Sequence, residues 1–243
     1  MMMSQSSGRR GLLWAVFGGL VLIAGIVAII VSSILSQRAP DPTETAGGGT
    51  NTPAPTTNGP TGEFVDPTVI EKGWIPEPIT TEDEIYIRAA LAAASTFDTT
   101  KSTREAWLAY LDAWFTPDTR YAEADRADRM KTAQVELRQG VVLPQESWES
   151  LAREAGRVIA MTTGDVAYVA VSDDASGDMS IGTSDVTLTF TRSDGSGGET
   201  SYDEHVRVSV QVLCGPDSVP TAGTAQQAGD CKVVRYFTEP LEP

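Results

Sequence analysis

The chain is poor in the side chains that most enzymes and metal centres use. It has one histidine, His205, and two cysteines, Cys214 and Cys231. A zinc site needs more cysteine and histidine ligands close together than these three residues supply. The sequence also lacks a nucleophile elbow, a phosphate-binding loop and a complete EF-hand loop. We therefore expect no enzymatic activity, no metal and no cofactor.

Positive charge is also scarce. The chain has 18 basic and 33 acidic residues, and three of the basic ones, Arg9, Arg10 and Arg38, lie in the first 38 positions, which hold no acid. The remainder carries 15 basic and 33 acidic residues, a net charge of −18. A surface of this sign repels nucleic acids and anionic lipid headgroups. We therefore expect no direct binding to nucleic acid.

One long apolar run, residues 11–35, contains no charged residue. A helix that crosses a bilayer needs about 20 such residues, so we predict a single transmembrane helix here. Residues 1–10 hold two of the flanking arginines and should form a short cytoplasmic tail, because basic flanks stay inside. The rest of the chain would then lie outside the cytoplasm, attached to the cell membrane.

Cleavage of the apolar run as a signal peptide is the alternative. Signal peptides have an apolar core of about 7–15 residues, and the run here is longer, with no clear cleavage site after it. A retained anchor could pack against other membrane helices through small residues that let backbones approach closely. The candidates are Gly18, Gly19 and Gly25.

Residues 36–79 are rich in proline, threonine and glycine. Most of this segment has too little to bury to offset the entropy of ordering it, so we predict a disordered linker. Its last part, "VDPTVIEKGWIPEP" (residues 65–78), alternates apolar residues with prolines, and we expect an extended lead-in that lies against the following domain. Residues 80–243 are long enough for one domain with its own core.

Three helices are predicted at the start of this domain. Thr81 with Glu84 and Ser102 with Glu105 have the spacing of capping boxes, which favours helices that begin at these points. We place the first helix through about Phe97, the second up to Pro117 and the third over about 119–138. The segment around Trp148 is predicted as a loop or short helical turn.

After position 156 the apolar pattern alternates with a period of two, which is typical of strands. We predict strands at 157–163 and 166–171, joined by a turn at Gly164–Asp165, and further strands at 184–192, 202–214 and 232–238. Helices followed by antiparallel strands indicate an α+β fold, with helices on one face of the sheet and a polar outer face. The inner face should hold Val186, Leu188, Phe190, Val206, Val208, Val210 and Val212, and the outer face His205, Arg207, Ser209 and Gln211.

The two cysteines are expected to form a structural disulfide. By the topology above, Cys214 and Cys231 lie outside the cytoplasm, where disulfides persist. Closing a loop of roughly 16 residues contributes about 3 kcal/mol to stability.

Four aromatic residues crowd into nine positions: Trp107, Tyr110, Trp114 and Phe115. At 100° per residue they fall on or beside one helix face. Such a stripe is more often core than site, and we favour packing against the sheet. The alternative is that the same residues line a pocket in a cone-shaped domain.

The segment "AAASTFDTTKSTREAWLAYLDAWFTPDTR" (residues 92–120) resembles the helical start of conjugal-transfer proteins of actinobacteria. The whole layout, with its tail, anchor, stalk and α+β domain, is similar to membrane-anchored members of the nuclear-transport-factor-two-like superfamily. Within that superfamily it looks most like the single-span scaffold proteins of type IV secretion and conjugation systems, including the TcpC type. The TcpC type has two outer domains, and this chain has room for one.

The resemblance implies a cone-shaped domain of helices packed on a curved antiparallel sheet. It implies no enzymatic activity and a scaffold role, with channel subunits as partners and self-association. We therefore predict a membrane-anchored assembly protein of a conjugation machine. The alternatives are an accessory protein of a Mce-type lipid importer and a domain that binds a small ligand in its cone.

Overall fold

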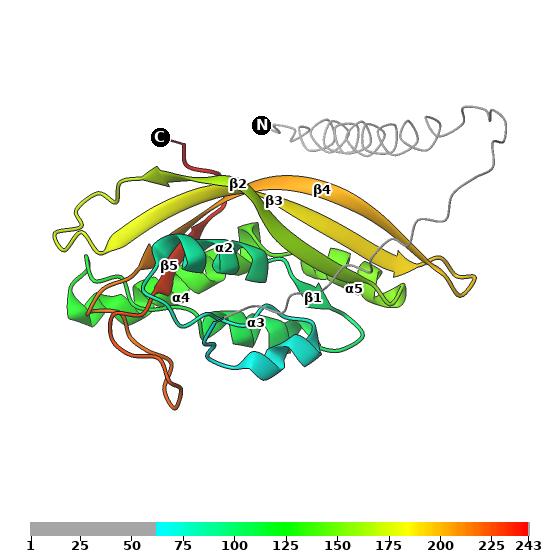
Figure 1. The fold of residues 1–243 in the computed structure, drawn as a ribbon, viewed down its shortest axis with the longest axis horizontal. Coiled ribbons are helices and arrows are strands. Elements are labelled where there is room, and N and C mark those ends of the chain that lie inside the picture. The colour runs from blue at the N-terminus through cyan, green and yellow to red at the C-terminus, as the bar shows by residue number, and fades with distance from the viewer. Residues whose placement is uncertain (1–61, 243) are drawn as a thin grey trace, which may run out of the picture. The chain divides into compact units, whose positions relative to one another are not determined.

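Five antiparallel strands form one curled sheet, and the helices lie beneath its concave face (Figure 1). The structure is a computed structural model that describes residues 62–242. Helices followed by an antiparallel sheet give the α+β fold that the sequence predicts. The elements are η1 (Pro67–Lys72), α2 (Asp83–Ala93), β1 (Phe97–Asp98), α3 (Arg104–Asp112), α4 (Glu123–Gly140), α5 (Gln145–Arg153), β2 (Arg157–Val169), β3 (Met179–Ser193), β4 (Glu199–Leu213) and β5 (Lys232–Phe237).

The strands follow one another across the sheet in the order β1-β2-β3-β4-β5. The predicted turn at Gly164–Asp165 is wrong, because β2 runs through it as one strand of 13 residues. The register against β3 shifts between Thr163 and Ala167, so this stretch is an irregularity of the bulge type. Gly164 takes a φ of 70° there, which glycine adopts without a steric penalty. A glycine–aspartate pair is compatible with a tight turn and with a bulge in a continuous strand, so the local sequence does not distinguish the two.

The inner face of the sheet is apolar, as predicted for β3, where Val186, Leu188 and Phe190 are buried. The prediction of a polar, solvent-facing outer face is wrong at two positions of β4. Ser209 and Gln211 are both buried. The hydroxyl of Ser209 accepts a hydrogen bond from the backbone of the C-terminal segment, and the Gln211 amide donates to the sulfur of Met179. The end of the chain covers part of the face that we expected to be open.

Both predicted capping boxes fail by one position. α2 begins after Glu82, which makes no side-chain cap. α3 begins after Thr103, whose hydroxyl accepts from the Ala106 backbone. Ser102 is used differently, because its hydroxyl accepts a hydrogen bond from the indole of Trp74 at 2.9 Å. The long-range hydrogen bond from Trp74 therefore occupies the hydroxyl that the local pattern predicts as the helix cap.

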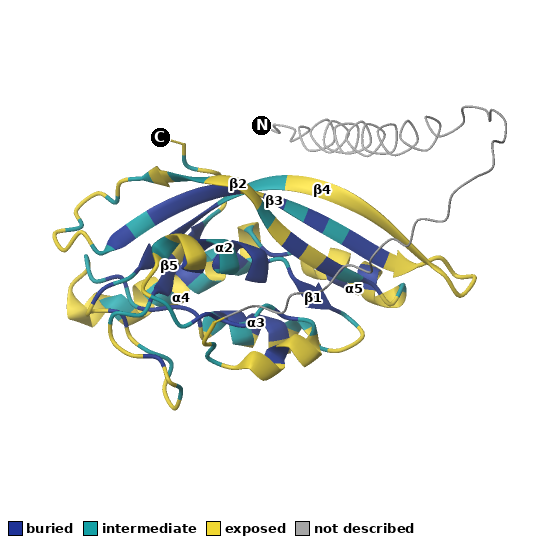
Figure 2. Ribbon diagram, viewed as in Figure 1, coloured by how far each residue is buried: buried dark blue, intermediate teal, exposed yellow. Residues whose placement is uncertain are grey.

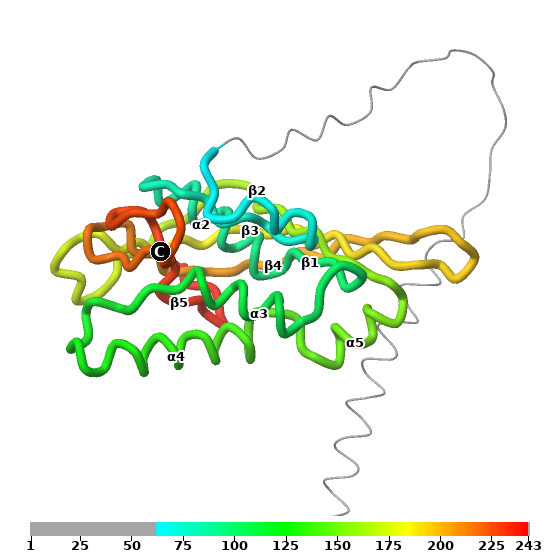
Figure 3. Tube along the Cα trace, turned by 90° about the horizontal axis from the view of Figure 1, so that it is seen from below, coloured from blue at the N-terminus to red at the C-terminus, as the bar shows by residue number. Residues whose placement is uncertain are grey.

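α3 is also shorter than predicted. It ends at Asp112, and the chain beyond it runs beside β5, where Val233 donates to the Trp114 carbonyl at 2.9 Å and accepts from Thr116 at 2.7 Å. α4 starts at Glu123, later than the predicted 119, and packs beside β5 (Figure 3). The segment around Trp148 is a nine-residue helix, α5.

The lead-in, residues 65–78, is not simply extended. It contains η1, a 3₁₀ helix capped by Asp66, and it buries Val69 and Trp74. Trp74 stacks on Tyr110 with ring centroids 5.0 Å apart. The predicted transmembrane helix and its glycines, Gly18, Gly19 and Gly25, lie outside the described residues. Within residues 62–242, no helix has the length and apolar character needed to span a bilayer.

Candidate functional site

The aromatic stripe belongs to the core between the helices and the sheet (Figure 2). Trp107 and Trp114 are 0% exposed, Phe115 is buried and Tyr110 is half-buried. Trp107 packs on Phe97 with ring centroids 5.0 Å apart. These side chains fill space between the layers, where solvent does not reach the two indoles.

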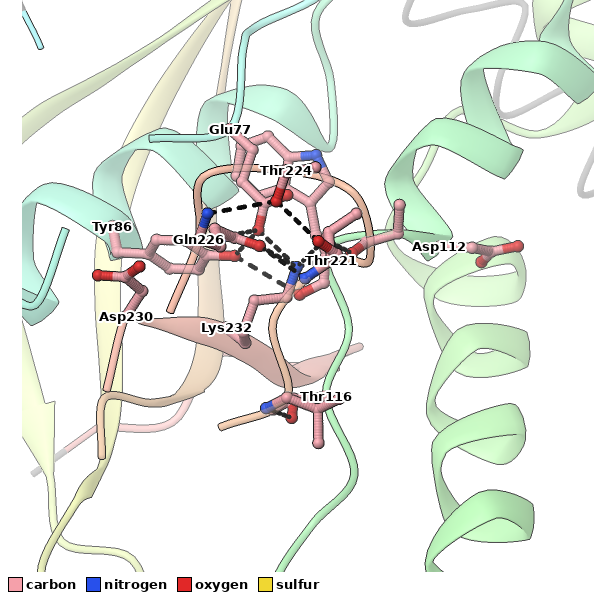
Figure 4. A network of polar contacts seen from close by, with 12 residues as sticks. Glu77, Tyr86, Asp112, Thr116, Thr221, Thr224, Gln226, Asp230 and Lys232 are labelled. Carbon is pink, nitrogen blue, oxygen red and sulfur yellow. Dashed lines mark hydrogen bonds and ion pairs between the residues drawn. The ribbon is translucent and has the colours of Figure 1, made fainter. Parts of the chain in front are cut away.

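A buried ion pair joins the lead-in to the last strand. Glu77 lies between two prolines of the lead-in, and Lys232 is the first residue of β5. Both side chains are only 1% exposed, and the Lys232 Nζ lies 2.8 Å from Glu77 Oε1 (Figure 4). Taking two charges out of water costs several kcal/mol per ion, so the surroundings must supply further partners.

The Lys232 ammonium has those partners. It donates to the Ala113 carbonyl at 2.7 Å, to the Thr221 hydroxyl at 2.8 Å and to Gln226 Oε1 at 3.4 Å. Together with Glu77 there are four acceptors for three ammonium protons, so all three protons are used and at least one is shared. The end of α3 and the loop before β5 therefore meet at one side chain.

The Glu77 carboxylate is equally well bound. Its Oε1 accepts from the Tyr86 hydroxyl at 2.6 Å and from Gln226 Nε2 at 3.1 Å, besides Lys232. The backbone on either side is fixed by Tyr110, whose hydroxyl donates to the Ile75 carbonyl at 2.7 Å and accepts from the Glu77 amide at 3.0 Å. The lead-in is thus held by α2, by α3 and by β5.

Burial sets the protonation behaviour of this network. It lowers the pKa of Lys232 below its ordinary value, an effect that the Glu77 charge only partly opposes. Burial, followed by the nearby Glu77 carboxylate, raises the pKa of Tyr86, and the same two causes raise that of Tyr236. Both tyrosines therefore stay protonated well beyond the range in which free tyrosine ionises.

The disulfide closes the loop that covers the network. Cys214 and Cys231 are bonded, as the sequence predicts. The loop between them carries Thr221 and Gln226, and Gln226 is 7% exposed. The Cys231 backbone donates to the Thr80 carbonyl at 2.8 Å, which ties the end of the loop to the lead-in.

His205 lies on the outer face of β4 and is exposed, as predicted. Its ring pairs with the Thr187 hydroxyl on β3 at 3.0 Å. Over the part of the chain that the structure describes, no three histidine, cysteine, aspartate or glutamate side chains gather closely enough to hold a metal ion.

The surface of the described residues has several grooves, and two of them differ in character. The larger of these two, of about 360 Å³, lies between α5 and the strands β3 and β4. Phe190 and Tyr202 line it as a stacked pair with ring centroids 5.1 Å apart, and Arg192 and Glu204 also line it. The smaller groove, of about 80 Å³, lies between α4 and β5 and is lined by Arg120, Tyr121, Arg129, Glu136 and Arg235 among others.

The sequence predicts the disulfide between the two cysteines and the packing of the aromatic stripe, but it does not predict the Glu77–Lys232 network. Two local signals were present. Glu77 is a lone charge between prolines in an otherwise apolar stretch, and Lys232 directly follows a disulfide cysteine. No protein-family model, no curated protein and no solved structure matches the chain, so comparison adds no further assignment.

Proposed function

We propose that this chain is a membrane-anchored scaffold of a bacterial conjugation or type IV secretion machine, with an outer domain that docks other subunits. One observation carries this proposal. β5 pairs with β4 only from Ser209 onward, so within the described residues the stretch 199–208 has β3 on one side and no strand on the other. An open strand edge can receive an extended segment of a partner through backbone hydrogen bonds.

The groove beside α5 gives this edge the means to select its partner. Alternate side chains of an added strand point to the same face, so those on the inner side would enter the groove towards Tyr202 and Glu204. The edge itself is highly charged, with Glu199, Asp203 and Arg207 besides Glu204. Such charges discourage unspecific strand pairing, and they favour a partner of complementary charge.

The fixed lead-in supports an anchored role. In this proposal the transmembrane helix and the linker connect the domain to the cell membrane. The chain then enters the domain at the segment that Trp74 and Glu77 hold in place. The disulfide suits a location outside the cytoplasm. Because the lead-in is firmly bound, the point at which the stalk joins the domain would be fixed relative to the docking edge.

The ligand-binding and lipid-transport alternatives have less support. Both need space behind the aromatic stripe. Trp107 and Trp114 are instead 0% exposed and pack on neighbouring aromatic rings.

Gentle extraction of the tagged full-length chain from its native host tests the proposal, with the co-purifying proteins identified by mass spectrometry. We expect secretion ATPases and channel subunits to be recovered, together with a second copy of the chain if it self-associates. Recovery of lipid-transport proteins in their place would contradict the proposal.

A further inference from the structure

An amine, a carboxamide and a carboxylate meet in the buried network. The Gln226 side chain directs its Nε2 at Glu77 Oε1, 3.1 Å away, and the Lys232 Nζ lies 2.8 Å from the same oxygen. The Gln226 Oε1 is 3.4 Å from Nζ and accepts a hydrogen bond from the Thr221 backbone N–H at 2.9 Å. The carboxylate thus touches both nitrogens, and a backbone donor touches the carbonyl oxygen.

This arrangement suits a reaction in which an acyl group moves from one nitrogen to another, here from Gln226 Nε2 to Lys232 Nζ. The Lys232 nitrogen is the nucleophile, the side-chain carbonyl of Gln226 is the electrophile, and Glu77 can move protons between the attacking and the leaving nitrogen. The Thr221 N–H is placed to stabilise the negative charge that develops on the carbonyl oxygen. We propose that Lys232 and Gln226 form an isopeptide bond within the folded domain, with Glu77 as the proton carrier.

The reaction balances without any other reagent. Glu77 takes a proton from the Lys232 ammonium, and the neutral amine attacks the carbonyl carbon of Gln226. Glu77 returns this proton to Nε2 as the old C–N bond breaks. It then takes the second proton from the new amide nitrogen and passes it to the departing ammonia. The products are a Lys232–Gln226 amide and an ammonium ion, with Glu77 again a carboxylate and no change in oxidation state.

The surroundings favour each step. Burial disfavours the charged ammonium, in agreement with the lowered pKa of Lys232. The Tyr86 hydroxyl holds Glu77 and the Ala113 carbonyl holds Lys232, so both groups are fixed beside the Gln226 side chain, and groups held in position react as if at very high concentration. Water is excluded, since both charged side chains are 1% exposed, so hydrolysis does not compete.

The loop that carries Gln226 can make the remaining approach. It is bounded by the disulfide, and Gly223 and Gly229 adopt positive φ values of 78° and 107° within it. The product would close a smaller ring, residues 226–232, that reducing agents do not open. It would keep Gln226 attached to Lys232 even when the disulfide is reduced.

Tryptic peptide mapping of the purified full-length chain, after denaturation, reduction and alkylation, tests the proposal. Trypsin cuts after Arg207, Lys232 and Arg235, but not after a lysine whose amine is acylated. We expect a peptide from Val208 to Arg235 that is uncut at Lys232. Its measured mass should be lower by one ammonia than the mass calculated from its sequence. Complete cutting after Lys232, with Gln226 at its normal mass, would overturn the proposal. So would a peptide that joins Lys232 to Glu77 with loss of water.

Two variants test the roles of the residues. Gln226→Asn keeps a carboxamide but shortens its reach, and we expect cutting after Lys232 to be restored. Glu77→Gln removes the proton carrier, and we expect the same result. Ammonia loss that persists in Glu77→Gln would remove Glu77 from the mechanism. The wild-type peptide map decides the existence of the bond even if either variant fails to fold.

Discussion

Lys232 donates to Glu77 at 2.8 Å, although the two residues are 155 positions apart and each is only 1% exposed. The contact joins the segment by which the chain enters the domain to the strand that completes the sheet. It also places the end of α3 and the disulfide-closed loop around one ammonium. The lead-in is therefore part of the folded domain and not merely a neighbour of it.

Removing one partner of this pair should be costly. Lys232→Met removes the nitrogen that donates to the buried Glu77 carboxylate, and loss of one partner of a buried pair typically costs about 3–5 kcal/mol. Urea denaturation followed by tryptophan fluorescence would measure the change. The matched control is Arg157→Ala, which breaks an exposed ion pair with Glu199, where we expect at most about 1 kcal/mol. Equal losses in the two variants would show that burial of the pair is unimportant.

Stability should fall as the pH rises through the ordinary tyrosine pKa of 10.0. The pKa of Tyr86 and that of Tyr236 are raised in the folded state by burial and then by Glu77. Above pH 10.0 the unfolded chain loses protons that the folded chain keeps, so alkali favours unfolding. Where the Lys232 amine is not acylated, its lowered pKa acts in the opposite direction, because below its ordinary value of 10.5 the unfolded chain binds more protons.

The two effects can be separated by unfolding measurements on either side of pH 10.0. Tyr86→Phe removes one ionisable group and should flatten the loss of stability in alkali. A Tyr86→Phe protein with the same alkaline slope as the wild type would contradict the assignment.

Reduction of Cys214–Cys231 should lower stability without unfolding the domain. Loop closure of this size contributes about 3 kcal/mol, and the loop keeps its contacts with Thr116 and Glu77 after reduction. Thermal unfolding with and without reductant measures the difference. An identical melting temperature under both conditions would mean that the bridge contributes nothing.

The chain after Arg38 should not bind DNA. Its net charge of −18 opposes phosphate contacts, although salt screens the repulsion. In a gel-shift measurement at physiological salt, we expect no retardation by the folded chain. Salt-sensitive binding with micromolar affinity would contradict this.

The sequence predicted those features of the fold that depend on local pattern. The alternation of valines in β4 and the apolar side of β3 place both strands and their inner face. The pairing of Cys214 with Cys231 follows from there being only two cysteines. The spacing of the aromatic stripe matches one helix face, which favours a place in the core.

The rest depends on contacts between distant segments, which no local pattern contains. Ser102 would cap a helix if the Trp74 indole did not use its hydroxyl. Trp114 would continue α3 if β5 did not pair with its backbone. The ion pair of Glu77 with Lys232 could not be predicted, because the local signal at each residue does not show which distant residue it meets. Only the folded chain brings them together.

The most direct test of the scaffold role compares two side-chain truncations in the native host. Tyr202→Ala removes an aromatic ring from the groove beside the open edge of β4, and Met161→Ala removes a side chain that is 64% exposed and does not line that groove. The measurement is the amount of channel subunits that co-purifies with each tagged full-length variant, relative to the wild type. We predict a clear loss for Tyr202→Ala and none for Met161→Ala. Unchanged recovery with Tyr202→Ala, or equal losses in both variants, would contradict docking at this edge.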